Sequence, residues 1–277
     1  MNCASALVRD VSRQCREIIA LAGRSENSAD QKLWLLCHRE VSPKLQGRRP
    51  RCGLSALSMA AELLQKQDND GALCPMEETQ ELDNLLKMAQ ARGFSYQGEM
   101  YSAENLAKLA KEFYGFEYLV TRTAFEDTSD NFVISEVLKG NAVLIPYDAD
   151  KNHEPCLENG HRAHWALITG ILCELDGNSF DWTMCKQDDN MPMLFHASPS
   201  SKYILPQNGK FQNTYLCVKH GKSRHTAVWT LESLRRSNAN LFELDPSKER
   251  QTGQYLIPEE GLREELCGKV VVLFSKA

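Results

Sequence analysis

Hydrophobic periodicity predicts that the first half of the chain is helical. Apolar residues recur at helical spacing over residues 7–22, just before Gly23, and they surround most of the helix predicted over residues 53–64. Two further helices are predicted, over residues 76–91 and 102–114. A helix that is apolar around its circumference is normally buried, so we expect the segment 53–64 to be the central helix of the core.

Runs of strand length dominate the second half of the chain. These runs are short and apolar or β-branched, and they cover residues 118–122, 142–145, 164–172, 215–218 and 270–274. Short helices are predicted between them, over residues 132–138 and 230–236. The polar, Pro-bearing stretch 176–213 has the character of an insertion, and residues 33–41 are only a short, partly apolar lead into a loop.

The order of these elements predicts an α+β protein with three parts. A main domain covers residues 33–245, an N-terminal helical extension covers residues 1–32, and a C-terminal segment of residues 246–277 packs its final strand on the domain. The length of 277 residues is enough for one large domain with such extensions. No internal repeat interrupts this pattern.

The charge composition argues against some classes of binding partner. The chain carries 32 Lys plus Arg and 37 Asp plus Glu, a net charge of -5, without a long run of one sign, so neither nucleic acid nor an anionic membrane is expected as a partner. No apolar run approaches the roughly 20 residues that cross a bilayer. Because charges are spaced through the first 23 residues, we expect a cytoplasmic protein.

The ten cysteines are scattered singly, which is typical of a reducing compartment. Five of them have Leu, Ile or Val close by and are expected to be buried thiols: Cys15, Cys37, Cys173, Cys217 and Cys267.

Cys52 is the candidate nucleophile because it follows Pro50 at the end of a loop and begins the buried helix. A helix N-terminus favours a thiolate, and Arg48, Arg49 and Arg51 add positive potential, so we expect a lowered thiol pKa. The alternative is a buried helical cysteine beside a solvated basic loop.

Gln46 lies six residues before Cys52, in the arrangement Gln-Gly-x-x-x-x-Cys-Gly. A cysteine peptidase needs a donor for the oxyanion formed at the scissile carbonyl, and a side-chain amide close to the sulfur supplies one. One loop can therefore hold both the nucleophile and the oxyanion donor.

His164 is the candidate base, because it heads the strand HWALITG and its ring can project from a rigid sheet toward Cys52. The residue that orients His164 is expected at the end of the following strand. His220 is the positional match there, and Asp181 and Asn178 in the preceding loop are the alternatives.

A zinc site is a rival interpretation of the same stretch. The spacing H-x2-C-x4-H-x2-H joins His153, Cys156, His161 and His164, but it is not a familiar structural-zinc pattern. We therefore expect no metal and no cofactor, and we interpret His161 as a loop residue beside the active site.

Gln46 and four sequence blocks together resemble the actin maturation protease family over about residues 33–245: RCGLSALSMAAELL, VLKGNAVLIPYD, GHRAHWALITGIL and HGKSRHTAVWTLESLRRSNANL. The resemblance implies a papain-like cysteine peptidase fold, related to bacteriocin-leader peptidases, in which a helical half carries Cys and an antiparallel sheet half carries His. It also implies an aminopeptidase that removes the N-acetylated Met or Cys from the start of actin, with Cys52 as nucleophile.

The basic loop fits such a substrate, because Arg48, Arg49 and Arg51 can attract the Asp and Glu residues that follow the scissile bond. Two features depart from the family. This chain has no Pro-rich N-terminal tract of the kind suited to profilin, so profilin is not expected as a partner of this form, and His220 stands where an Asn or Asp is expected. The alternatives are a cysteine hydrolase acting on another protein terminus, such as a ubiquitin-like one, and an inactive binding module of the same fold.

Overall fold

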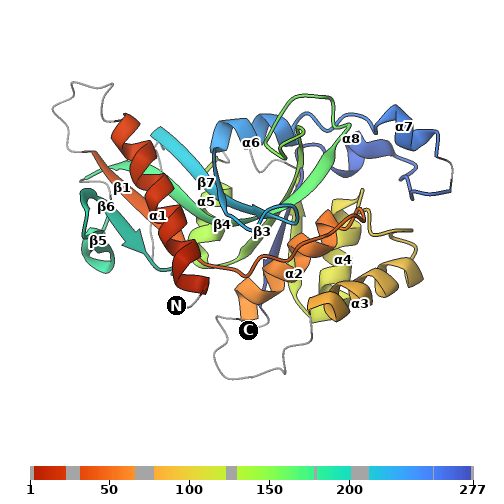
Figure 1. Ribbon diagram of the computed structural model, residues 1–277, viewed down its shortest axis with the longest axis horizontal. Coiled ribbons are helices and arrows are strands. Elements are labelled where there is room, and N and C mark those ends of the chain that lie inside the picture. The colour runs from red at the N-terminus through yellow and green to blue at the C-terminus, as the bar shows by residue number, and fades with distance from the viewer. Residues whose placement is uncertain are drawn as a thin grey trace.

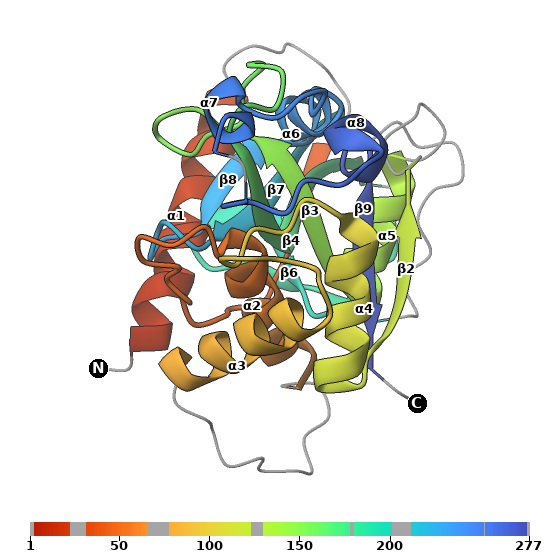
Figure 2. The same cartoon turned by 90° about the vertical axis from the view of Figure 1, so that its right-hand side faces the viewer.

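The computed structural model describes residues 3–22, 32–65, 78–122, 130–177, 180–200, 212–251 and 253–275. Within these residues a sheet of nine strands carries helices on both faces (Figure 1, Figure 2). The expectation of an α+β protein is therefore confirmed.

The helices of the first half lie where the periodicity predicts them, and Cys52 is the first residue of its helix. α4 begins at the N-cap Ser102, whose side chain accepts a hydrogen bond from the Asn105 N–H, and it ends at the left-handed Gly115. The helices of the described residues are α1 Cys3–Ala22, α2 Cys52–Gln65, α3 Glu78–Ala91, α4 Ala103–Tyr114, α5 Asp130–Lys139, the 3-10 turn η1 Trp182–Met184, α6 Leu231–Asn238, α7 Pro246–Glu249 and α8 Gly261–Glu265.

The strands form one sheet in the order β2-β9-β3-β4-β1-β6-β5, and β7 pairs with both β4 and β8. Their bounds are β1 Lys32–His38, β2 Glu117–Thr121, β3 Ala142–Asp148, β4 Ala163–Asp176, β5 Lys186–Asp188, β6 Met191–Ala197, β7 Gln212–His220, β8 Ala227–Thr230 and β9 Val270–Phe274.

The long strand β4 organises the sheet, because it pairs antiparallel with β3, β1 and β7. Its register places His164 opposite Tyr147 and Ala166 opposite His220. The ladder between β4 and β7 shifts at Gly170, where an added Cβ would lie 2.4 Å from the Cys37 carbonyl oxygen. Glycine thus lets β1 approach β4 closely at this irregularity.

Alternating side chains of the sheet build cores on its two faces. On one face Trp165 and Leu167 of β4 pack with α2, α3 and α4, and on the other Ala166 and Ile168 pack with α5 and α6. α1 adds Val11, Cys15 and Ile19 to a further cluster, which includes Trp34 and Leu36 of β1. The first helix therefore leans on the main sheet, as its apolar stripe predicts.

The sheet contains four strands that the sequence pattern did not predict, β1, β5, β6 and β8. Residues 32–38 form β1, and the predicted insertion contains β6, which pairs in parallel with β1. The sheet is therefore not wholly antiparallel. β1 and β6 pair with each other across a long separation in the sequence, so local hydrophobic periodicity does not predict them.

The C-terminal residues are part of the same architecture. β9 lies between β2 and β3, so this last strand is an inner member of the sheet. Of the five cysteines expected to be buried, Cys15, Cys37, Cys173 and Cys217 are, whereas Cys267 is partly exposed and donates to the Ala239 carbonyl at 3.1 Å. Across the described residues, no helix is both long enough and apolar enough to cross a membrane.

Candidate active site

Cys52 is held against the sheet by the packing of α2. All residues of this helix except Glu62 and Gln65 are buried. At Gly53 an added Cβ would lie 2.9 Å from Met100 and 3.2 Å from the Trp165 ring, so only glycine allows this close approach. The Cys-Gly pair therefore sets the thiol beside the start of β4.

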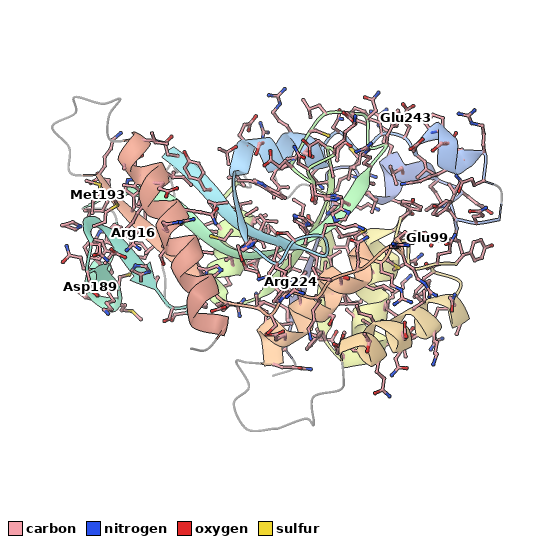
Figure 3. All side chains as sticks on the ribbon, in the orientation of Figure 1. Arg16, Glu99, Asp189, Met193, Arg224 and Glu243 are labelled. Atoms are coloured by element: carbon pink, nitrogen blue, oxygen red, sulfur yellow. The ribbon has the colours of Figure 1, made fainter. Side chains whose placement is uncertain are left out.

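A cleft of about 310 Å³ brings Cys52 together with Gln46 and His164. Other elements complete its wall, and Figure 3 shows Glu99, one of these residues, in the loop between α3 and α4. The lining consists of Gln46, Pro50, Cys52, Glu99, Met100, Tyr101, Ala149, His153, Arg162, Ala163, His164, Trp165 and Lys248.

The His164 ring lies inside a cluster of rings. It stacks on His153 with ring centroids 5.2 Å apart, and it meets Tyr147 and His220 edge to face at 5.7 and 5.6 Å. Its Nε2 atom is buried without a hydrogen-bond partner, and among the described residues no hydrogen bond joins the ring to Cys52 or His220. Ring packing holds the imidazole in place, while its Nε2 atom stays free to accept a proton.

Of the three residues considered for orienting His164, the structure brings His220 to it. The His220 Nδ1 accepts a hydrogen bond from the Lys222 N–H at 3.3 Å, and its ring stacks on Trp229. Asp181 instead caps η1 by accepting from the Thr183 N–H. Asn178 lies outside the described residues.

Gln46 is buried and fixed at two points. Its backbone N–H donates to the Gly221 carbonyl at 2.9 Å, and its side-chain Nε2 donates to the Arg49 carbonyl at 3.1 Å. An added Cβ at Gly221 would lie 3.0 Å from Ser55 of α2 and 3.2 Å from the Gln46 Cβ, so the residue that follows β7 fits tightly against both. A primary amide has two N–H groups, so one remains to bind an oxyanion.

The expectation of a lowered pKa for the Cys52 thiol is wrong. Burial raises the pKa of Cys52, and the backbone N–H groups of Trp165 and Gly53, with Lys248 and Lys222, only oppose this effect. Burial, followed by the nearby His220 and His153, holds the pKa of His164 well below its usual range. Both directions favour a neutral thiol and a neutral imidazole in the resting pair.

The predicted arginines do not line the cleft. Arg48 and Arg49 are exposed, and Arg51 forms an ion pair with Asp83 of α3 at 2.8 Å. The cations that do line it are Arg162 and Lys248, which sequence reasoning missed. Arg162 lies only two residues from His164, and this proximity was the one signal available for it.

The residues of the rival zinc pattern have other contacts. His161 lies 3.0 Å from the Glu243 carboxylate, and His153 packs on His164. Within the described part of the chain no three His, Cys, Asp or Glu side chains are arranged to hold a metal ion.

A family model and individual relatives of the chain both point to the same protein family. Residues 41–172 match the family model described as actin maturation protease-like, C-terminal domain. The chain is 33% identical over 262 residues to the actin maturation protease of Xenopus tropicalis, covering 95% of this chain and 81% of that protein. It is 34% identical to that of Danio rerio (94% and 81% covered) and 34% identical to that of Homo sapiens (87% and 66% covered). No solved structure matches the chain.

Proposed function

Because the chain belongs to the actin maturation protease family, we propose that it is a cysteine aminopeptidase that removes the N-acetylated initiator Met or Cys from actin. The product is actin with its acidic mature N-terminus. We further propose a papain-like arrangement, in which a helix carrying the nucleophile packs on a sheet carrying the base. We also propose that the protein acts in the cytoplasm.

The observation that carries the proposal is the cleft shared by Cys52, His164 and Gln46. Acyl transfer needs a nucleophile, a base and a preformed oxyanion site, and these three side chains supply one each. The cleft also has an apolar wall, to which Met100, Tyr101 and Ala149 contribute. An acetylated Met or Cys is uncharged, so such a wall suits it.

In the first half of the proposed reaction, His164 accepts the thiol proton as the Cys52 sulfur attacks the scissile carbonyl carbon. The remaining Gln46 N–H and the backbone N–H of Cys52 bind the oxyanion. His164 then protonates the leaving amine, which is the new N-terminus of actin, as the C–N bond breaks.

In the second half, water attacks the acyl-thioester on Cys52. His164 takes a proton from this water and returns one to the sulfur, and the acetylated amino acid leaves. Because the resting pair is neutral, proton transfer accompanies attack, and no preformed thiolate is needed.

His220 is proposed as the positioning residue for His164, since the two rings lie in contact and His220 is itself fixed by the Lys222 N–H. For Arg48 and Arg49, which are exposed, we propose attraction of the acidic substrate at long range. The ion pair with Asp83 ties Arg51, the residue before Cys52, to α3.

Intact-mass analysis of actin tests the proposal. Actin bearing its acetylated initiator residue is incubated with the protein or with the Cys52→Ala form, and the expected result is loss of one acetylated residue with the unmodified protein only. Unchanged actin with selective alkylation of Cys52 points to another protein terminus as substrate. Unchanged actin with an inert Cys52 points to a binding module.

A further inference from the structure

Arg162 and Lys248 are the basic side chains among the described residues that line the cleft. Lys248 belongs to α7, and Arg162 immediately precedes β4. We propose, on the premise of the proposed function, that these two cations bind the acidic side chains that follow the scissile bond and so determine the specificity of the site.

The first support is that both cations are available to a ligand. Among the described residues neither forms an ion pair, whereas Arg51 is held by Asp83. The Lys248 ammonium lies 5.9 Å from the centre of the Tyr101 ring, on the cleft wall. Arg162 is exposed, whereas Lys248 is half-buried and is influenced by the Asp245 carboxylate without forming an ion pair with it. A ligand carboxylate in direct contact would relieve the cost of burying the Lys248 ammonium.

The second support is that the two segments carrying these cations are joined. The Asn159 carbonyl accepts hydrogen bonds from the Phe242 and Glu243 N–H groups, both at 3.0 Å. At Gly160 an added Cβ would lie 3.0 Å from the Leu241 Cα, which makes the approach tight. The loop before β4 and the segment before α7 thus form one support, and the two charges are held by a common frame.

The acidic residue of the cleft does not cancel this charge. Glu99 is buried, and its carboxylate accepts hydrogen bonds from the N–H groups of Tyr96 and Gln97 at 2.8 Å and of Leu256 at 2.9 Å. These three donors compensate its charge locally. Glu99 fixes the segment that follows α7 to the loop before α4, and so supports the wall that carries Lys248.

The test compares two N-acetylated peptides that begin with Met. In one peptide three Asp residues follow the Met, and in the other three Asn residues do. The proteins compared are the unmodified protein, Lys248→Met, Arg162→Gln and their double variant. Met keeps most of the length of the Lys248 side chain, so packing on Tyr101 is retained.

Each single variant is expected to lower kcat/KM about tenfold more for the acidic peptide than for the Asn peptide. Arg162→Gln should leave the Asn peptide within about twofold, whereas Lys248→Met should lower it about threefold, because Lys248 also favours the Cys52 thiolate. Lys248→Arg should restore most of the loss. Lys151→Gln is the matched control, because Lys151 is exposed on the same loop as Arg162 and does not line the cleft. Equal losses for the two peptides would overturn the proposal. A further variant, Arg48→Gln/Arg49→Gln, is measured alongside, and a loss of acidic preference found only there would also overturn it.

Binding separates this inference from the proposed function. The Cys52→Ala form and the Cys52→Ala/Lys248→Met form are each titrated with the two labelled peptides. The acidic peptide should bind about tenfold more weakly to the form that also carries Lys248→Met. If this difference is found while the unmodified protein cleaves neither peptide, the aminopeptidase proposal fails and the acidic site stands. If both peptides bind alike to both forms, the acidic site fails whatever the cleavage result.

Discussion

The two walls of the cleft differ in how they are built. The first wall, residues 46–53, is continuous in the sequence and runs from Gln46 through the basic loop into α2. The second wall is assembled from the loop before β4 and the segment containing α7, which are far apart in the sequence and joined through Asn159. In Figure 2 α7 lies near the top of the view and α2 lies lower, in front of the strands.

This difference in construction coincides with a difference in chemistry. The first wall carries the proposed nucleophile and the proposed oxyanion donor, and its arginines lie outside the cleft or pair with Asp83. The second wall supplies the cations Arg162 and Lys248, and His164 follows directly behind it on β4. The proposals thus assign nucleophilic attack and recognition of the acidic side chains to separate parts of the fold, and variants in each part should separate the two properties.

The largest effect is expected from His164→Ala. Loss of the base should lower kcat by about 10² to 10⁴-fold. His161→Ala is the matched control, because its ring pairs with Glu243 at 3.0 Å and does not line the cleft, so its kcat should stay within twofold. Steady-state cleavage of the acetylated peptide measures both, and equal losses would remove the distinction between these two histidines.

Gln46→Ala should have the next largest effect. Removing the oxyanion donor is expected to lower kcat about 10²-fold with KM nearly unchanged, because the interaction forms only in the transition state. Gln90→Ala, at an exposed amide that donates to the Tyr96 carbonyl, serves as control. A rise in KM at constant kcat would assign Gln46 to substrate binding instead.

His220→Ala should lower kcat about tenfold by freeing the His164 ring. His220→Asn should recover most of this loss, since an amide can also hold an imidazole. The pH profile of kcat is the deciding measurement: an effect through His164 moves its acidic limb, whereas general loosening lowers the whole curve. His225→Ala, an exposed histidine five residues away, should change neither.

The smallest effect is expected from Lys248→Met on the reactivity of Cys52, because the Lys248 ammonium of the second wall acts on the thiol of the first wall. Because burial raises the pKa of Cys52 and lowers that of His164, alkylation of Cys52 should rise about tenfold per pH unit from pH 7 to 9. Lys248→Met removes a cation that favours the thiolate, so the rate at pH 8 should fall about threefold. A plateau of reactivity between pH 5 and 7 would instead reveal a preformed thiolate and imidazolium pair.

The sequence predicted the first wall well, because its signals are local. The loop, the helix start at Cys52 and the spacing to Gln46 are contiguous, and the structure brings Gln46, Cys52 and His164 into one cleft. Its position at the end of a predicted strand also located His220, whose neighbour on β4 is Ala166.

The sequence did not predict the second wall, because long-range contacts build it. Nothing near Lys248 indicates that it lines the same cleft as Cys52, and β1 pairs with β4 and β6, which are distant from it in the sequence. The expected thiolate was wrong for a related reason: a sequence displays nearby arginines, whereas burial, which dominates the pKa of Cys52, depends on the whole fold.

The most direct test of the account is detection of the acyl-enzyme. The protein is mixed with an activated ester of N-acetylmethionine, quenched in acid within seconds, digested and mapped by mass spectrometry. We expect an acetylmethionyl group on Cys52 alone, formed much more slowly in His164→Ala and absent in Cys52→Ala. An adduct on another residue, or peptide cleavage by Cys52→Ala at the unmodified rate, would contradict the assignment of Cys52 as nucleophile.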